Sequence, residues 1–396
     1  GILLPFLPES KRWVKKGLRS LNREGMRQIY RDGTYLQHSH NYQRLVIQLY
    51  TWCMIIGREG NITFYSEIHN KLSKSIMFLY NIQDNKTGRI PNYGSNDGTL
   101  LQPLSECDYL DYRPQLQTLY YILNRKFLYQ SGQWNENLLW FIDEKDLPIS
   151  DKLNITRVSA EYPDGGYFVL RNKRYNSFSV IRCATYKHRP AQADMLHFDF
   201  WYKGKNIFCD SGTFSYNSSF MNNQYFSSTR AHNTVVIDHK DQMERCSRFL
   251  WGSWTKSKLN EFRGYYPIYF DGEHYGYNNV IHRRQIRVKE NLWWIRDEIT
   301  GDFKNAIINW NIRYGKLLKT PDCVIIDSGS EKIYIKTNYD VSFKDGYISE
   351  YYSVKNTINR MTGQCQRKED SVIFHTVIGL GKNISEIDIS SLIKTF

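Results

Sequence analysis

The chain has 396 residues, a formal net charge of +13 and 15% aromatic residues, which include 30 Tyr and 10 Trp. This length exceeds one small hydrophobic core, so we expect two domains. A basic surface rich in flat rings suits an acidic polymer, and an acidic polysaccharide fits. Because the sequence has no zinc-finger spacing, no RNA-binding signature and no dense Lys/Arg tract, we predict no nucleic-acid partner.

Seven Cys residues are scattered along the chain without a CxxC pair, so we predict neither a zinc knuckle nor a disulfide framework. There is no run of 18 apolar residues, which predicts no membrane span. No signal peptide is visible, but the sequence begins at Gly1 rather than Met, as a processed or truncated N-terminus would.

Residues 1–150 are predicted to form a helical domain. Apolar residues at three- and four-residue spacing predict helices over 41–56, 65–82 and 112–128. The polar, Gly-containing stretch 84–105 lies between the second and third helices and is longer than a connection needs. We therefore expect it to be a functional loop.

Residues 151–396 are predicted to form an antiparallel β-sandwich, so the fold class is α+β with a boundary within 145–162. Short strand-like runs bounded by Gly, Asn and Asp recur there. The predicted strands are 167–171, 178–182, 196–201, 234–237, 286–288, 293–296, 307–312, 324–326, 332–337 and 372–378.

The stretch 189–238 concentrates polar residues at strand ends. Strand patterns at 195–201 and 206–209 flank the turn Lys-Gly-Lys at 203–205, and 233–237 forms a third, β-branched run. Polar residues at such places serve turns or a site. They are Gln192, Asp194, Asp210, His232 and Asn233.

Several long segments carry a family resemblance. They read AQADMLHFDFWYKGKNIFCDSGTFSYN, YFSSTRAHNTVVIDHKDQMERCSRFLWG, DGTYLQHSHNYQRLV, PNYGSNDGTLLQPLSECDYLDYRPQL and VIHRRQIRV with WWIRDEITG. They closely resemble the heparinase II/III-like polysaccharide lyases. The resemblance implies an (α/α) toroid, here only its later part, followed by a multi-layer antiparallel β-sandwich. It also implies β-elimination of a uronic-acid polysaccharide at the interface of the two domains, in the periplasm or outside the cell.

Such a reaction removes the weakly acidic C5 proton of a uronate, so the substrate carboxylate must first be neutralised. By resemblance, Asn41 is the candidate neutraliser, with His38 and His40 beside it just before a predicted helix. The alternative is that Ser39 or Asn41 only caps the helix and the histidines lie on the surface.

Tyr93, in the loop PNYGSNDG, is by resemblance the candidate catalytic tyrosine; the alternative is an ordinary packed aromatic residue. Gln192 stands where the family commonly has His, and an amide cannot titrate. Either Tyr93 then carries all the proton transfer, another His takes over, or activity is lost. Tyr216 or Tyr225 is a candidate second phenol and Arg230 a candidate carboxylate ligand, with packing an equally good interpretation.

By resemblance to metal-bearing members, Asp194, Asp210 and His232 are candidate ligands of a structural divalent ion, zinc before calcium or manganese. The alternative is a turn Asp and a hydrogen-bonded His. His197 is another possible ligand, but on a strand it would face away from Asp194. Further positive charge comes from His188, Arg189, His282, Arg283 and Arg284. Arg283 and Arg284 stand at the start of a predicted strand and could face the cleft, but charged strand ends are usually solvated, so we expect all five to lie outside the site.

Two functions follow from these patterns. The first is a lyase acting on an acidic, uronate-containing polysaccharide, and the sequence does not distinguish a glycosaminoglycan from alginate or a capsular glycan. The second is a non-catalytic glycan-binding relative in capsule or exopolysaccharide production, which Gln192 motivates.

Overall fold

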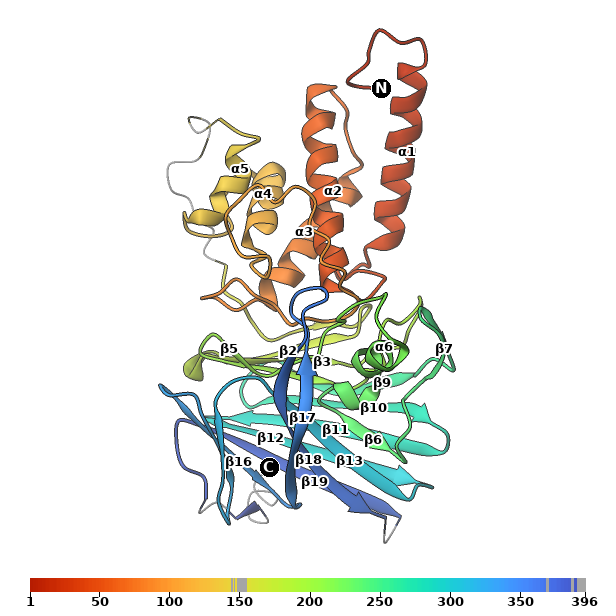
Figure 1. Cartoon of the computed structure of the whole chain (residues 1–396). Helices are drawn as coiled ribbons and strands as arrows, with labels where there is room; N and C mark the ends of the chain where they lie inside the picture. Colours follow the sequence, from red (N-terminus) through yellow and green to blue (C-terminus); the bar gives the residue numbers. More distant parts are fainter. Residues whose placement is uncertain (144, 146, 148–154, 368–369, 386–387, 390–396) are drawn as a thin grey trace. The chain divides into compact units, whose positions relative to one another are not determined.

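A computed structural model describes residues 1–143, 145, 147, 155–367, 370–385 and 388–389 (Figure 1). It divides into two compact units, one made of residues 1–90 and 98–157 and the other of 91–97 and 158–396. We call these the helical unit and the β unit. The predicted boundary between residues 150 and 151 lies outside the described residues.

The helical unit contains α1 (Ser10–Gln28), α2 (His40–Glu59), α3 (Ser66–Asn81), α4 (Arg113–Asn124) and α5 (Glu136–Leu139). The three predicted helices are confirmed as α2, α3 and α4, and each buries its apolar stripe. The last ends at Asn124 rather than near 128, because Arg125 adopts a left-handed conformation with φ 55°. The periodicity did not single out α1.

Two antiparallel sheets make up the β unit. The first has the order β1-β2-β3-β4-β5-β13-β18-β17, with β6 beside β13, and the second the order β14-β15-β16-β19-β12-β11-β10-β9. The first sheet comprises β1 (Ala160–Tyr162), β2 (Tyr167–Asn172), β3 (Ser177–Arg182), β4 (Phe198–Tyr202), β5 (Lys205–Phe208), β6 (Val235–Ile237), β13 (Asn305–Ile312), β17 (Val341–Ile348) and β18 (Asn356–Gln366). The second sheet comprises β9 (Ser257–Arg263), β10 (Ile268–Tyr277), β11 (Val280–Lys289), β12 (Leu292–Gly301), β14 (Lys316–Lys319), β15 (Val324–Asp327), β16 (Lys332–Thr337) and β19 (Ser371–Leu380).

A core of aromatic and branched side chains joins the two sheets. Phe200 on β4 meets Trp293 on β12 with ring centroids 5.0 Å apart, and Phe198 lies 6.2 Å from the same indole. All three side chains are fully buried in one continuous cluster. The predicted fold class, helices followed by an antiparallel β-sandwich, is confirmed (Figure 1).

Two of the boundaries that differ from the prediction concern the candidate site. The strand predicted to start at residue 195 or 196 starts at Phe198, because Leu196 has φ 57° and the His197 N–H donates to the Asp194 carbonyl in a turn. Residues 91–97, predicted within the helical domain, belong to the β unit. A separate hairpin, β7 (Glu244–Ser247) and β8 (Leu250–Gly252), and helix α6 (Phe220–Ser227) complete the β unit.

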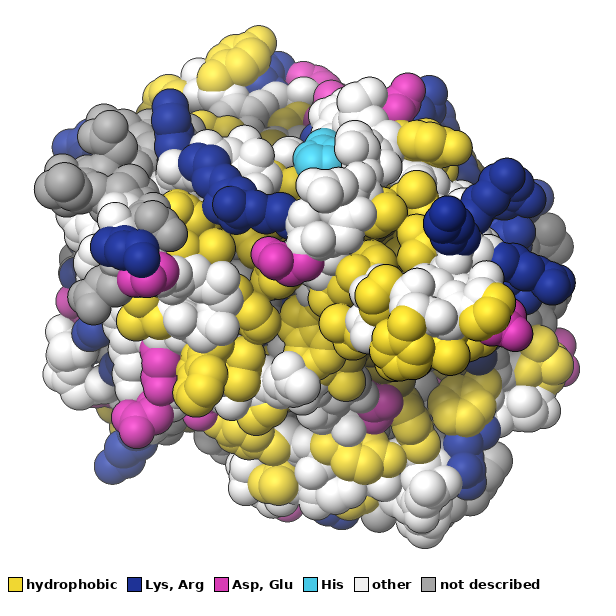
Figure 2. Space-filling model, turned by 90° about the horizontal axis from the view of Figure 1, so that it is seen from above, with side chains coloured by type: hydrophobic (Ala, Val, Ile, Leu, Met, Phe, Trp, Pro, Cys, Tyr) yellow, Lys and Arg dark blue, Asp and Glu magenta, His cyan; other side chains and the backbone are white. Residues whose placement is uncertain are grey.

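Basic side chains are dispersed on the face shown in Figure 2, where dark-blue Lys and Arg alternate with yellow hydrophobic side chains. The prediction that the protein has no nucleic-acid partner is compatible with this dispersal and stays a prediction. None of the helices in the described part of the chain has both the length and the apolar character needed to cross a membrane.

Candidate active site

The loop that carries Tyr93 is fastened to the β unit by hydrogen bonds on both sides. The Gly94 N–H donates to Gln192 Oε1 at 3.1 Å, and the Thr213 hydroxyl donates to the Gly94 carbonyl at 3.0 Å. Asn92 Nδ2 donates to the Ser349 carbonyl at 2.8 Å. Gly212 permits this approach, because a Cβ there would lie 2.6 Å from Asn92 Nδ2. These bonds fix the backbone on either side of Tyr93.

Tyr93 is held inside this unit with 1% of its surface exposed. Its ring meets the His197 ring edge-on at 5.1 Å and the Tyr167 ring at 5.7 Å, and its hydroxyl donates to the His197 carbonyl at 3.4 Å. Burial raises the pKa of Tyr93 well above its ordinary value, and nearby carboxylates raise it further. The phenol is therefore neutral near pH 7 and carries its proton.

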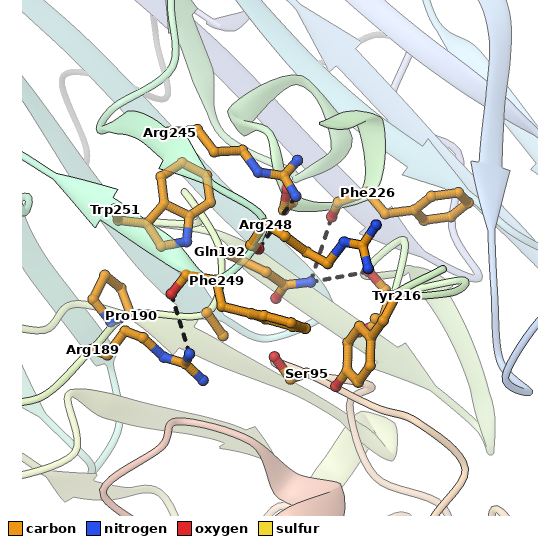
Figure 3. Close-up of a pocket in the computed structure, with 14 residues that line it drawn as sticks. Ser95, Arg189, Pro190, Gln192, Tyr216, Phe226, Arg245, Arg248, Phe249 and Trp251 are labelled. Carbon is orange, nitrogen blue, oxygen red and sulfur yellow. Dashed lines mark hydrogen bonds between the residues drawn. The ribbon is translucent and has the colours of Figure 1, made fainter. Parts of the chain in front are cut away.

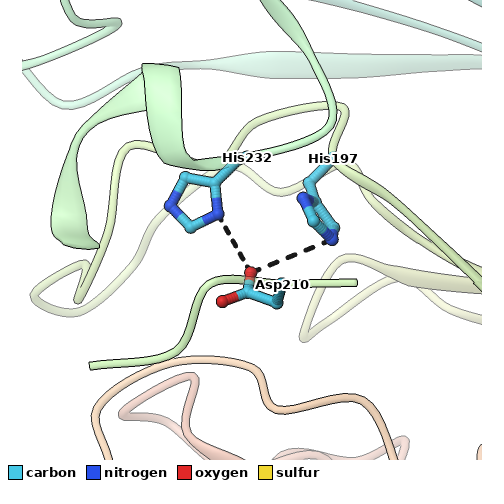
Figure 4. Close-up of side chains that lie close together, drawn as sticks. All are labelled: His197, Asp210 and His232. Carbon is cyan, nitrogen blue, oxygen red and sulfur yellow. Dashed lines mark hydrogen bonds and ion pairs between the residues drawn. The ribbon is translucent and has the colours of Figure 1, made fainter. Parts of the chain in front are cut away.

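His232 and Asp210 form a buried pair (Figure 4). His232 Nδ1 lies 2.9 Å from Asp210 Oδ2, and Asp210 Oδ1 accepts from the Gly212 N–H at 2.7 Å. Burial lowers the pKa of His232, but the charge and hydrogen bond of Asp210 outweigh burial and raise it overall. The same pairing holds the pKa of Asp210 below its ordinary value, against burial. Asp210 therefore carries the negative charge and His232 Nδ1 the proton.

The second ring nitrogen of His232, Nε2, differs from Nδ1 in its contacts. Nε2 is fully buried and has no hydrogen-bond partner among the described residues. With Nδ1–H fixed on Asp210, Nε2 is the atom that would accept a proton, as in other carboxylate-oriented histidines. The His197 ring lies between Tyr93 and His232, with centroids 5.1 and 5.4 Å away, so the three rings are contiguous.

The predicted metal set is not the set that the structure brings together. His197, Asp210 and His232 place donor atoms within 4.8 Å of one another, and Asp194 is not among them. Asp194 instead accepts from the Tyr186 hydroxyl at 3.0 Å and lies 4.0 Å from Arg182 Nε. The alternation argument that separated His197 from Asp194 required a strand, and residues 194–197 form a turn instead.

Hydrogen bonding argues against a metal at this revised set, although two imidazoles and one carboxylate suit zinc by type. His197 Nδ1 accepts the Asn233 backbone N–H at 2.9 Å, so in the neutral ring the proton sits on Nε2. A metal-bound His normally donates its other N–H outward, and this one accepts instead. The residues present fit a hydrogen-bonded His–Asp pair better than a metal centre.

We therefore expect removal of divalent ions by EDTA to leave the melting temperature unchanged. The His232–Asp210 hydrogen bond needs no ion to hold it. Differential scanning fluorimetry with and without EDTA, then with added zinc, calcium or manganese, checks this. A melting temperature that falls with EDTA and returns with one of these ions would establish the structural metal predicted from the sequence.

Asn41, in the helical unit, presents a buried donor. Its Oδ1 accepts from Arg44 Nη2 at 2.9 Å and from the Tyr109 hydroxyl at 2.8 Å, which fixes the amide orientation. Nδ2 then has no partner among the described residues, although the side chain is only 2% exposed. Arg44 is itself clamped between Tyr109 and Tyr112, 4.3 and 4.2 Å from their ring centroids. Such an amide suits a carboxylate ligand.

The neighbours of Asn41 resolve part of the alternative interpretation. Ser39 is the N-cap of α2, since its hydroxyl accepts from the Tyr42 N–H at 3.1 Å. His38 and His40 are buried rather than on the surface, and the His40 ring packs on Phe78 at 5.7 Å. The cap alternative is therefore right for Ser39, and the surface alternative is wrong for both histidines.

Gln192 has a positioning role in this structure. Its Oε1 accepts from the Gly94 N–H at 3.1 Å, and its Nε2 donates to the Gly212 carbonyl at 3.0 Å. Both ends of the amide thus tie the loop after Tyr93 to the segment after Asp210. Gln192 also lines a pocket with Tyr216, which is shown in Figure 3.

The other tyrosine and arginine candidates have packing contacts. Tyr216 meets the Phe249 ring at 5.2 Å and the Tyr352 ring at 5.7 Å. Tyr225 packs edge-on against Phe226 at 5.2 Å, and its hydroxyl accepts from the Tyr347 N–H. The guanidinium of Arg230 lies 5.5 Å from the Tyr225 ring.

Sequence reasoning missed a buried network behind the site. Arg284 and His282 are fully buried, not solvated strand ends. Arg284 Nε and Nη2 donate to the two oxygens of Asp297 at 2.6 and 3.1 Å, and His282 Nε2 lies 2.7 Å from Oδ1. Arg284 Nη1 donates to the carbonyls of Leu196 and Asn233 at 2.5 and 2.7 Å. Those residues adjoin His197 and His232, so Arg284 fixes the backbone that carries both rings.

Helices followed by a two-sheet antiparallel sandwich match the architecture of toroid-and-sandwich proteins. In this chain the sandwich holds a buried Tyr near a His–Asp pair. The family described as "Heparinase II/III-like, C-terminal" matches residues 154–363, more than half of the chain. The chain therefore belongs to the heparinase II/III-like family, as its sequence resemblance predicted.

Two curated relatives are both named heparin-sulfate lyase. One, from Bacteroides stercoris, is 25% identical over 324 residues, 79% of this chain and 43% of its own length. The other, from Bacteroides thetaiotaomicron, is 21% identical over 359 residues, 84% of this chain and 47% of its own. The chain thus spans less than half of the length of these relatives.

Solved structures share the fold. A heparinase III structure has a TM-score of 0.75 at 20% identity, covering 96% of this chain and 57% of its own. Heparan sulfate lyase from Pedobacter heparinus has a TM-score of 0.72 at 16% identity and covers 96% and 58%. Chondroitin AC lyase from Streptomyces coelicolor is more distant, with a TM-score of 0.54 at 9% identity and coverage of 93% and 56%.

Proposed function

We propose that this protein is a polysaccharide lyase that cleaves an acidic, uronate-containing polysaccharide by β-elimination. The observation that carries the proposal is the pair formed by a neutral, buried Tyr93 phenol and the unpartnered Nε2 of His232, with the His197 ring between them. One group can donate a proton and the other accept one. The names of the relatives point to heparan-type glycosaminoglycans as the first substrates to test.

In the proposed reaction, His232 Nε2 takes the C5 proton of the uronate. The electron pair of that C–H bond forms the C4–C5 double bond, and the bond from C4 to the glycosidic oxygen breaks. Tyr93 gives its proton to the departing oxygen, which leaves as a hydroxyl. A side-chain amide donor to the substrate carboxylate, the role predicted for Asn41, would make the C5 proton more acidic.

A second candidate is the glycan-binding relative without catalysis. Gln192 cannot take part in proton transfer, and both Tyr93 and His232 are almost wholly buried. Binding of this kind would weaken with added salt, because it rests on opposite charges. A periplasmic or secreted location fits both candidates and stays a prediction.

Incubation with heparan sulfate, alginate and a uronate-containing capsular glycan separates the two candidates. The lyase predicts a rise in the ultraviolet absorbance of unsaturated uronate with at least one of them. Glycan binding without any rise, measured by calorimetry on the same samples, would instead favour the second candidate.

We expect Asn41→Asp to lower kcat/KM on the preferred glycan by about a hundredfold or more. The new carboxylate keeps the acceptor for Arg44 and Tyr109 but replaces the amide donor with a negative charge that repels the substrate carboxylate. Steady-state kinetics check this, with Asn81→Asp, another buried Asn of the helical unit, as the control for folding. An Asn41→Asp enzyme with unchanged kcat/KM would remove Asn41 from the mechanism.

A further inference from the structure

A pocket of the β unit gathers arginine and aromatic side chains beside the candidate site. Arg245 and Arg248 come from the β7–β8 hairpin, and Arg189 precedes Gln192 in the chain (Figure 3). Tyr216, Phe249 and Trp251 form its aromatic walls. The proposed proton transfer does not use these three arginines, although all of them line one pocket.

Two of the three arginines have no carboxylate partner in the described part of the chain, and Asp241 lies near the third, Arg245. Among the described residues, Arg189 and Arg248 have no acidic group within ion-pair distance. Arg248 Nη1 donates to the Asn217 side-chain oxygen at 2.9 Å, and Arg189 Nη1 donates to the Phe249 carbonyl at 3.2 Å. Burial and the charge of Arg248 lower the pKa of Arg245, although Asp241 opposes them. A bound anion would relieve this repulsion and complete the hydrogen bonds of the guanidinium groups.

The aromatic walls are suited to the apolar face of a sugar ring. Phe249 is 43% exposed and contacts the Tyr216 ring edge-on with centroids 5.2 Å apart, so part of its ring is accessible to a ligand. Arg189 lies over the Phe249 ring, 5.6 Å from its centroid. Cation and ring face are thus offered together, as an anionic sugar requires.

Gln192 links the pocket to the loop that carries Tyr93. This residue lines the pocket, and its Oε1 accepts the N–H of Gly94, the residue after Tyr93. We propose that the pocket binds a second anionic sugar of the same polysaccharide, with the arginines holding its sulfate ester or carboxylate. The assignment rests on the proposed function, since it extends that site by one sugar.

Calorimetric titration of the Tyr93→Phe protein, which we expect to bind without cutting, tests the pocket. The ligands are a sulfated heparan oligosaccharide and an unsulfated one of equal length and backbone. We expect Arg245→Gln and Arg248→Gln each to weaken binding of the sulfated ligand by about tenfold. An effect confined to the sulfated ligand identifies a sulfate ester as the bound group, and an equal effect on both identifies a carboxylate.

Arg174→Gln is the matched control, because Arg174 is an exposed arginine of the same unit outside the pocket. We expect it to leave both affinities unchanged. Unchanged affinities in the two hairpin variants, or a wild-type pocket that binds neither ligand, would overturn the assignment. If protein that keeps Tyr93 still cleaves the glycan when it carries either hairpin change, the proposed function survives that failure. Arginine-dependent binding by protein that keeps Tyr93 but cuts no glycan would overturn the lyase proposal alone.

Discussion

Replacing Tyr93 by Phe should lower kcat by between about a hundredfold and ten-thousandfold and leave KM nearly unchanged. The change removes the only titratable atom of Tyr93, whereas the ring keeps its edge-on contacts with His197 and Tyr167. The hydroxyl makes a 3.4 Å bond to the His197 carbonyl, so its loss should change the free energy of unfolding by no more than about 1 kcal/mol. Steady-state kinetics and chemical denaturation check the two expectations.

Tyr277→Phe is the matched control for this variant. Tyr277 is also a buried tyrosine of the β unit whose hydroxyl lies 3.3 Å from a backbone carbonyl, that of Val235. We expect a similar small change in stability and an unchanged kcat. Equal activity of the Tyr93→Phe and wild-type enzymes would show that another group donates the proton.

Asp297→Asn should lower the free energy of unfolding by about 3–5 kcal/mol. The Asn side chain has the same shape but leaves the fully buried Arg284 charge without its bidentate partner. Burial raises the pKa of Asp297, but Arg284 and His282 outweigh it, so the native carboxyl is charged. Because Arg284 also holds the Leu196 and Asn233 carbonyls, we expect kcat to fall in the fraction that remains folded. Denaturant melts and kinetics measure both effects.

The adjacent residue on β11 supplies the contrast. Arg283 pairs with Asp271 on β10; the Asp271 side chain is 4% exposed, but that of Arg283 is 38% exposed, so solvent can stabilise the guanidinium when its partner is lost. Asp271→Asn should therefore lower the free energy of unfolding by less than Asp297→Asn and leave kcat unchanged. Equal losses from Asp297→Asn and Asp271→Asn would contradict the assignment of a structural role to the buried network.

The sequence predicted the helices and most of the strands well where periodicity was regular. Residues 195–197 were wrongly predicted as part of a strand, because Leu196 adopts a left-handed backbone conformation that residues other than Gly rarely adopt. Period-two alternation therefore did not apply to His197. A turn that depends on a backbone bond between His197 and Asp194 is not visible in residue types alone.

Long-range partners account for the other differences. Arg284 lies directly opposite Asp297 in the β11–β12 register, and only this pairing allows its charge to be buried. Tyr93 belongs to the β unit because Gln192 and Thr213, about a hundred residues later, bond the glycine after it. The resemblance singled out Tyr93 as a catalytic candidate and Asp210 and His232 as candidate metal ligands. The hydrogen bond between Asp210 and His232, and the position of the proton on His197 Nε2, could be inferred only from the three-dimensional structure.

Digestion of heparan sulfate in water labelled with heavy oxygen, followed by mass spectrometry, tests the central claim most directly. Elimination by His232 and Tyr93 predicts products without solvent oxygen, one of them an unsaturated uronate lighter by one water than its hydrolysis counterpart. Heavy oxygen at the new chain end would contradict β-elimination and identify a hydrolase.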